Sequence, residues 1–195
     1  SRYFDRITRP EQILTSLPQA INVMLDPADC GPAVISMSQD VQGEAYDYPE
    51  IFFEEKIHEI RRIHPDPNQI QKAADKLKKS KQPIIISGGG VLYSEAEEEI
   101  STFAKKHNIP VTATVMGIGC MNKDDPYYIS AIGCLGEGSS NNLATDTDLA
   151  LAVGTKLGDF TTGSWTNFEN ENFQLVSINT SRFDTTKHRA TPVVS

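Results

Sequence analysis

The stretch PIIISGGGVLYSEAEEEI, residues 83–100, decides the fold of this chain. Its first residues, Pro83 to Ser87, are almost wholly apolar, which is typical of a strand buried on both faces of a parallel sheet. The run Gly88-Gly89-Gly90 then predicts a tight turn, and the spacing of Ser94 and Glu97 predicts a capping box. A helix is expected to continue from Ala96 to about His107. The stretch therefore predicts a strand, a turn and a helix in immediate succession.

The same alternation continues on both sides of this stretch. Before it, Asp66 can cap a helix that has Pro67 at its first position. After it, apolar strands are expected at residues 110–114, 148–154 and 173–178, with a short helix at 139–145. Residues 191–195 resemble the opening of a further buried strand, whereas the glycine-rich residues 117–138 have no clear period. Strands alternating with helices predict a doubly wound parallel α/β domain.

The N-terminal residues predict only part of a second α/β unit. Because a proline breaks the middle of a helix, Pro18 is placed in the first turn of a helix at 17–25, capped near Ser16, after a short turn at 10–14. An apolar strand is expected at 33–37. One helix and one strand cannot enclose a core, so residues 1–50 are interpreted as the end of a domain whose body is missing. Residues 51–65 are charged and proline-containing and are interpreted as a linker to residues 66–195.

Charge and cysteine content narrow the classes of function. The 18 basic and 26 acidic residues give a net charge of −8, which argues against nucleic acid and an anionic membrane surface as partners. No apolar run of ~18 residues is present to span a membrane. Cys30, Cys120 and Cys134 are too few and too far apart for a disulfide framework or a zinc ribbon. We therefore expect a cytoplasmic protein, and a start other than Met suggests a fragment.

The glycine turn is the first candidate for chemistry, because backbone N–H groups between a strand and a helix can bind a phosphate. The dinucleotide pattern fails at two points: Tyr93 stands where a third glycine belongs, and no acidic residue ends the strand at 110–114. We therefore favour a structural turn over a nucleotide site.

The second candidate is formed by two glycine clusters, 117–119 and 133–138. Both follow strands, at the edge where open α/β sheets bind ligands. A cofactor groove and flexible loops pressed against a partner domain both fit them, and the sequence does not choose between these two.

Other single residues have structural interpretations. His58 and His64 have no third ligand at metal spacing, Cys120 is expected to be a buried free thiol, and Trp165 a loop anchor. No catalytic nucleophile with a partner base is found.

Six segments, in their order and spacing, resemble the thiamine-diphosphate enzyme superfamily, which includes acetolactate synthase and pyruvate oxidase. They lie at residues 31–35, 39–42, 81–90, 109–114, 133–136 and 148–157. The resemblance implies that residues 1–50 are the C-terminal part of a pyrimidine-binding domain and that residues 66–195 are the central domain.

Two stretches, 39–49 and 179–188, resemble the trihydroxycyclohexanedione hydrolase family of myo-inositol degradation in particular. That family opens the ring of trihydroxycyclohexane-1,2-dione to give 5-deoxy-glucuronate. The resemblance implies thiamine diphosphate and magnesium in the full-length parent, with no cofactor on the fragment. It also implies that the catalytic glutamate and the Gly-Asp-Gly motif lie in the missing pyrimidine and diphosphate-binding domains. No catalytic or metal-binding residue is therefore assigned to this chain, and the fragment alone is expected to be inactive.

Flavin-binding relatives in the superfamily use the glycine loops of the central domain. This implies a nucleotide groove at Gly88, Gly89, Gly90, Gly136 and Asp159, although Ile118 replaces the lysine that is usual between two glycines. The alternative function is thus the central domain of an acetolactate synthase-like carboligase or decarboxylase that binds FAD or ADP. A homo-oligomer is expected in either case. In the fragment, we expect residues 1–50 to pack against another copy of the chain or to fold back on residues 66–195, because their apolar side chains have lost their cover.

Overall fold

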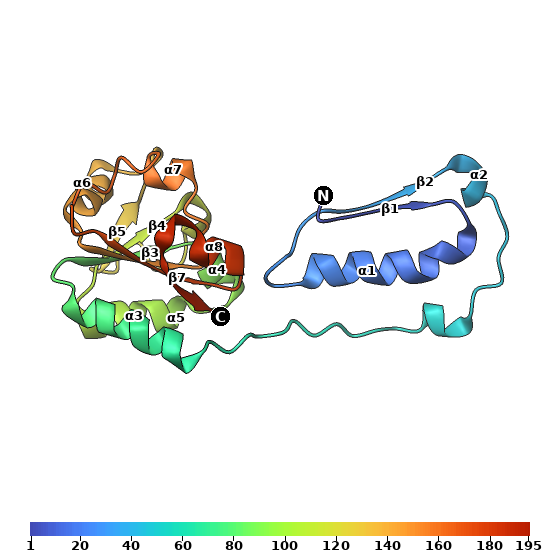
Figure 1. Cartoon of the computed structure of the whole chain (residues 1–195), viewed down its shortest axis with the longest axis horizontal. Helices are drawn as coiled ribbons and strands as arrows, with labels where there is room; N and C mark the ends of the chain where they lie inside the picture. Colours follow the sequence, from blue (N-terminus) through green and yellow to red (C-terminus); the bar gives the residue numbers. More distant parts are fainter. The chain divides into compact units, whose positions relative to one another are not determined.

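The computed structural model describes all residues from 1 to 195, and the chain divides into two compact units (Figure 1). The first unit is Ser1–Arg62 and the second is Ile63–Ser195. Residues 55–66 between them form no helix or strand. Each unit is described by itself.

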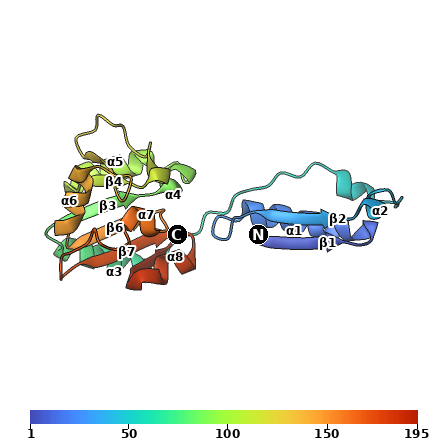
Figure 2. The same cartoon turned by 90° about the horizontal axis from the view of Figure 1, so that it is seen from above.

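The second unit is built on one parallel sheet of six strands. Their order across the sheet is β5-β4-β3-β6-β7-β8, as Figure 2 shows for the central strands. The strands are β3 (Pro83–Ser87), β4 (Val111–Ala113), β5 (Tyr128–Ala131), β6 (Leu149–Val153), β7 (Gln174–Asn179) and β8 (Thr191–Val194). Every neighbouring pair is parallel, so the predicted doubly wound α/β fold is confirmed.

Helices cover both faces of this sheet (Figures 1 and 2). On one face, α3 (Pro67–Lys79) and α5 (Glu97–His107) pack on side chains such as Ile85, Val111 and Val176. On the other face, α6 (Gly138–Asp146) packs on Ile84 and Ile86. Consecutive residues of β3 thus face opposite cores, which explains why this strand is apolar throughout. Short helices follow three strands: α4 (Gly89–Tyr93), α7 (Asp159–Thr162) and α8 (Arg182–Thr186).

Of the two helix N-caps predicted in this unit, that of α3 is confirmed and that of α5 is wrong. Asp66 caps α3 as predicted, because its side chain accepts a hydrogen bond from the amide of Asn68 at 2.8 Å. The capping box at Ser94 and Glu97 is wrong. Ser94 instead ends α4, and α5 begins after Ala96 without a side-chain cap. The reason is that α4 lies between the glycine turn and α5, so Ser94 is at the C-terminal end of one helix and not at the start of the next.

Three short elements of the second unit were not predicted from the sequence. β5 lies inside the glycine-rich region and is the edge strand beside β4, so its residues are only half-buried and carry no apolar run. The short 3₁₀ helices η3 (Val115–Gly117) and η4 (Lys187–Arg189) lie in the connections before β5 and β8. The strand expected at 191–195 is confirmed as β8.

The first unit is a two-stranded parallel sheet with one helix. β1 (Tyr3–Ile7) pairs with β2 (Ala33–Met37), and α1 (Ile13–Leu25) connects them. The expected strand at 33–37 is confirmed, whereas β1 was not predicted. Three short elements complete the unit: η1 (Pro10–Gln12), α2 (Gln39–Gln42) and η2 (Glu50–Phe53).

The boundary predicted for the first helix is wrong, since α1 begins at Ile13 and contains Pro18. A proline removes one N–H group, and its ring crowds the carbonyl four residues earlier, which here is that of Leu14. Leu14 lies in the first turn of α1, so the lost bond is a single one near the end of the helix. The Ser16 hydroxyl does not cap the helix; it donates to the carboxylate of Asp5 in β1 and to the carbonyl of Gln12.

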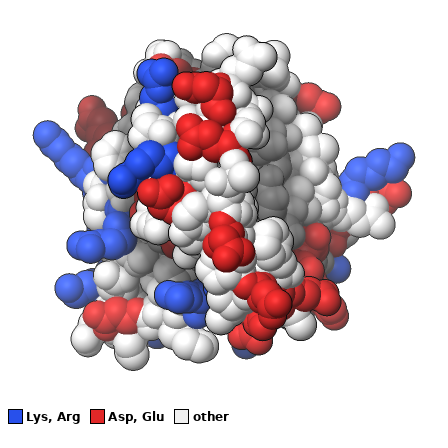
Figure 3. Space-filling model, turned by 90° about the vertical axis from the view of Figure 1, so that its right-hand side faces the viewer, with Lys and Arg blue, Asp and Glu red and all other residues white.

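No helix in the structure combines the length and the apolar character needed to cross a membrane. Figure 3 shows that both acidic and basic side chains are exposed on the surface. The 26 acidic residues outnumber the 18 basic ones, which gives the net charge of −8.

Candidate functional site

The strand order of the second unit identifies the edge at which a ligand would bind. From β3 the chain adds β4 and β5 on one side, and β6, β7 and β8 follow on the other side. The order therefore reverses between β3 and β6, and open α/β sheets bind ligands beyond the carboxyl ends of the strands at such a point. The candidate site lies where β3 ends at Ser87 and β6 ends at Val153.

The glycine turn after β3 is packed directly against the backbone after β6. A Cβ atom on Gly88 would lie 2.3 Å from the Gly154 carbonyl oxygen, and a Cβ atom on Gly90 would lie 2.6 Å from the Gly154 Cα. The Gly88 amide donates to the Val153 carbonyl at 2.8 Å, and the Gly90 amide to the Gly154 carbonyl at 2.9 Å. These glycines are thus required by close backbone contact, and both amides bind protein oxygens.

The middle glycine faces a different neighbour. A Cβ atom on Gly89 would lie 3.1 Å from the Met116 carbonyl oxygen in η3. The three glycines of the turn therefore contact the segments that follow both neighbouring strands, β4 and β6.

Gly136 and Asp159 lie on neighbouring segments. Gly136 closes a turn by donating to the Gly133 carbonyl at 2.9 Å. A Cβ atom on Gly133, whose φ is +99°, would lie 2.0 Å from the carbonyl oxygen of Phe160 in α7. Asp159 is the exposed first residue of the same helix. The structure thus brings the predicted residues to one segment, 154–163: the glycine turn contacts its start and the Gly133–Gly136 turn contacts Phe160.

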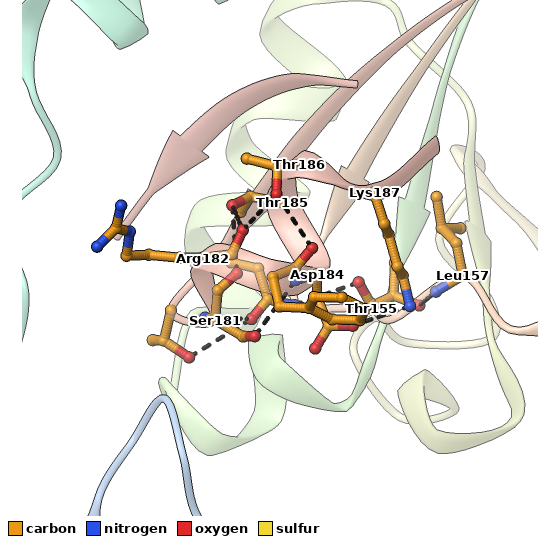
Figure 4. Close-up of polar contacts among 11 residues, drawn as sticks. Thr155, Leu157, Ser181, Arg182, Asp184, Thr185, Thr186 and Lys187 are labelled. Atoms are coloured by element: carbon orange, nitrogen blue, oxygen red, sulfur yellow. Dashed lines mark hydrogen bonds and ion pairs between the residues drawn. The ribbon is translucent and has the colours of Figure 1, made fainter. Parts of the chain in front are cut away.

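A polar network after β7 joins this edge and was not identified from the sequence (Figure 4). The Asn179 side-chain amide donates to the Thr155 carbonyl at 3.2 Å, and its oxygen accepts from the Ser181 amide at 2.9 Å. The Ser181 hydroxyl caps α8 by accepting from the Asp184 amide at 3.3 Å. The sequence feature that could have indicated this network is Asn179 at the end of a buried strand, followed by Ser181 at the start of a helix.

The charges beside this network are paired within the protein. The Lys187 ammonium lies 2.8 Å from the Asp184 carboxylate, and both side chains are largely buried. Burial, followed by the positive charge of Lys187, lowers the pKa of the nearby His188 imidazole. The His188 ring lies 4.5 Å, between centroids, from the ring of Trp165, which agrees with a loop-anchor role for that tryptophan. The network therefore holds the segments after β6 and β7 together.

Two thiols lie near this edge, and Cys134, in the Gly133–Gly136 turn, is exposed. Cys120 is completely buried, as expected, and its burial raises the pKa of the thiol. It is therefore poorly suited to act as a nucleophile. Across the whole chain, no group of three or more His, Cys, Asp or Glu side chains lies close enough to hold a metal ion.

Comparison with known families and proteins gives a consistent assignment. The family model described as "Thiamine pyrophosphate enzyme, central domain" matches residues 70–195. The chain is 44% identical over 195 residues to the 3D-(3,5/4)-trihydroxycyclohexane-1,2-dione hydrolase of Halalkalibacterium halodurans, covering 100% of this chain and 31% of that protein. It is 41% identical over 195 residues to 3D-(3,5/4)-trihydroxycyclohexane-1,2-dione hydrolase 1 of Bacillus cereus, covering 100% of this chain and 30% of that protein.

A solved structure supports the fold. Benzoylformate decarboxylase from Polynucleobacter necessarius matches with a TM-score of 0.71 and 20% identity, over 98% of this chain and 36% of that one. At this identity the likeness concerns the fold alone. The chain thus spans about a third of the length of the proteins it matches.

Proposed function

This chain belongs to the thiamine pyrophosphate enzyme family, and on that premise we propose that it is the structural central section of a hydrolase that opens the ring of trihydroxycyclohexane-1,2-dione. The observation that carries the proposal is the 44% identity over all 195 residues to a relative of that name. The proposed product is 5-deoxy-glucuronate, formed in the cytoplasm during myo-inositol degradation.

We propose the following domain organisation for the chain. Residues 1–50 are the C-terminal part of a pyrimidine-binding domain, 51–65 a linker and 66–195 the central domain. The division into compact units after Arg62 and the family match to residues 70–195 support this organisation. The remaining pyrimidine and diphosphate-binding domains would lie elsewhere in the same, longer polypeptide, which we expect to form a homo-oligomer.

In this proposal residues 1–195 form a scaffold that holds the catalytic domains in position. The catalytic groups belong to those other domains. Thiamine diphosphate, with magnesium, supplies a carbanion able to attack a ring carbonyl when it is bound by the full-length protein. The Gly-Asp-Gly motif that the resemblance implies for diphosphate and metal binding does not occur in this sequence. The internal pairing of Asn179, Ser181, Asp184 and Lys187 supports a scaffold role, because these groups bind one another.

The nucleotide groove at Gly88, Gly89, Gly90, Gly136 and Asp159 stays a prediction, and the geometry weighs against it. The space beside Gly88 and Gly90 is filled by the backbone of Gly154 rather than left for a phosphate. The absorbance spectrum of the purified full-length protein tests this directly. A flavin band would support the FAD-binding carboligase or decarboxylase as the alternative function.

The proposed function is tested by comparing the full-length protein with residues 1–195. The full-length protein, loaded with thiamine diphosphate and magnesium, should consume trihydroxycyclohexane-1,2-dione and form 5-deoxy-glucuronate. Calorimetric titration of residues 1–195 with the same cofactor and metal should show no binding. A full-length protein inert toward this substrate would refute the substrate, and micromolar cofactor binding by residues 1–195 would refute the scaffold role.

A further inference from the structure

Exposed apolar side chains in the second unit are concentrated at one edge of its sheet. Apart from Ile63 before α3 and Ile70 in its first turn, every exposed large apolar side chain of the second unit lies in a segment following the carboxyl end of a strand. We call this set the apolar edge: Tyr93, Val115, Met116, Ile118, Leu135, Phe160 and Phe183. Phe160 is 72% exposed and Phe183 is 75% exposed. Five successive strands, β3 to β7, each contribute at least one member.

Backbone contacts join the segments of the apolar edge. Gly89, at the start of the helix that carries Tyr93, lies against the backbone of Met116. The amide of Cys134, next to Leu135, donates to the Phe160 carbonyl at 2.7 Å. The members therefore belong to neighbouring loops on one side of the unit and not to unrelated positions.

The opposite edge of the same sheet is polar and provides an internal comparison. Its loops contain Ser80, Lys81 and Gln82 before β3, Asp148 before β6, and the segment 170–172 before β7. The Asp148 carboxylate accepts hydrogen bonds from the amides of Lys81 and Gln82 and from the Ser80 hydroxyl. A concentration of apolar side chains at only one edge is a feature of protein interaction sites.

The segment that presents Phe160 is held in a fixed shape. Leu157, with φ +46°, and Trp165, with φ +69°, both adopt the left-handed region although neither is a glycine. The Leu157 amide donates to the Thr155 hydroxyl at 3.2 Å, and the Trp165 amide to the Thr162 hydroxyl at 3.2 Å. Such conformations are strained for residues other than glycine and persist where the surroundings impose them, often at binding and switch sites.

Both ends of the second unit lie at this edge. β8 is parallel to the other strands, so it ends at the same edge as they do, and Figure 1 shows the C-terminus beside α4 and α8. The Ser195 hydroxyl donates to the Ile63 carbonyl at 3.3 Å, and the Val194 amide to the Gln69 side-chain oxygen at 2.9 Å. A polypeptide that continues beyond Ser195 leaves the sheet here, close to the place where the chain enters from residue 62.

We propose that the apolar edge is the docking surface for the rest of the same, longer polypeptide. The inference rests on the part of the proposed function that makes this chain a section of a larger enzyme, and this chain spans only 31% of its relative from Halalkalibacterium halodurans. Segments tethered at this edge meet the apolar side chains at high effective concentration, which favours an intramolecular contact over one with a free partner.

Hydrogen exchange measured by mass spectrometry on the full-length protein and on residues 1–195 tests the proposal. Amides in segments 115–118, 133–137 and 158–163 should exchange at least about tenfold more slowly in the full-length protein, because docking covers these loops. Amides in segments 80–82 and 170–172 at the polar edge should exchange equally in both. Equal exchange at the apolar edge in both proteins would overturn the proposal.

A matched pair of substitutions shows whether the apolar side chains are responsible. Phe160→Asp in the full-length protein should remove the protection, whereas Asn172→Asp, which adds the same side chain at the exposed polar edge, should not. In residues 1–195 neither should change the melting temperature, since both side chains are exposed. Identical behaviour of the two full-length variants would count against docking.

Other occupants of the apolar edge would give different results. Protection of these loops that rises with the concentration of residues 1–195 would point to a second copy and refute the proposal. Protection caused by added FAD or ADP would point to a nucleotide and refute it also. Exchange does not depend on substrate, so a protein inactive on trihydroxycyclohexane-1,2-dione but protected at the apolar edge would refute the substrate assignment alone.

Discussion

Replacing Gly88 by alanine tests whether the glycine turn serves packing or a ligand. Gly88 has φ −108° and ψ −178°, an extended conformation that alanine adopts without strain. The added Cβ atom would lie 2.3 Å from the Gly154 carbonyl oxygen and 2.6 and 2.7 Å from the Thr155 Cβ and Cα. Any cost of the substitution is therefore steric and comes from the contact between the segments after β3 and β6.

The expected cost is large because rigid atoms are involved. Inserting one methyl group into a packed region typically costs about 1–3 kcal/mol, and the upper end applies when the neighbours cannot rotate away. Gly154 and Thr155 meet the new atom mainly with backbone, and the Gly154 amide is itself bound to the Ile178 carbonyl at 2.9 Å. We expect Gly88→Ala to lower the free energy of unfolding by about 3 kcal/mol, or the melting temperature by roughly 6–12 °C.

The assay is urea unfolding of residues 1–195 followed by circular dichroism, with Gly138→Ala as the matched control. Gly138 is exposed, is the first residue of α6, and has open space where a Cβ atom would stand. This control should change stability by less than about 0.5 kcal/mol or raise it slightly, because alanine favours the helix. A Gly88→Ala variant as stable as the control would refute the packing argument and return the turn to the nucleotide hypothesis.

Further predictions concern other parts of the chain. Burial would raise the pKa of Asp148, but hydrogen bonds from the Lys81 amide, the Ser80 hydroxyl and the Gln82 amide outweigh burial and lower it. Since the folded-state pKa lies below the unfolded one, these bonds stabilise the fold above about pH 4 and are lost as the pH falls through the folded value. Asp148→Ala should thus cost about 1–2 kcal/mol in urea unfolding at pH 7 and much less near pH 2, and a cost independent of pH would contradict this. Iodoacetamide should label the exposed Cys30 and Cys134 in the native chain but Cys120 only after unfolding, as peptide mass spectrometry can show. Limited proteolysis should cut first between residues 40 and 66, where Ile57 is 86% exposed, and a first cut within the six-stranded sheet would count against the linker. Residues 1–195 should self-associate in sedimentation experiments, unless residues 1–50 fold back on residues 66–195, and should become predominantly monomeric when residues 1–60 are deleted. An intact chain that stays monomeric at high concentration, with residues 1–50 freely mobile by NMR, would disprove the role of residues 1–50.

The central strands could be predicted because their sequences are dictated by burial on two faces. β3, β6 and β7 are apolar runs ended by polar residues or glycine, and a run of this kind has few alternatives in an α/β chain. β1 (Tyr-Phe-Asp-Arg-Ile) has neither an apolar run nor strict alternation, and it becomes a strand by pairing with β2, a contact distant in sequence. β5 is a short edge strand without an apolar run, so local pattern gave no signal for either element.

The position of the candidate site could also be predicted, but not its contacts. Glycines after a strand indicate close approach of something to the backbone, and the same three residues suit a phosphate or another loop. Whether a phosphate or another loop lies against the glycine turn depends on Gly154 and Thr155. These residues contact the turn because β3 and β6 are neighbours in the sheet, which the local sequence does not reveal. Asn179 was missed for a related reason, because its partner Thr155 lies after a different strand.

The first unit supplies independent support for a larger parent. In β1 and β2, Phe4 pairs with Val34, and these side chains are 64% and 42% exposed. The Tyr3 hydroxyl donates to Gln19 in α1, so α1 covers the face of the sheet that Tyr3 shares and leaves the face of Phe4 open. Parallel sheets are normally covered on both faces, and two strands alone are marginally stable. The first unit therefore requires further strands beside β1 or β2 and a cover over Phe4 and Val34. In the proposed full-length polypeptide, segments outside residues 1–195 would supply these strands and this cover, in addition to the contact proposed at the apolar edge.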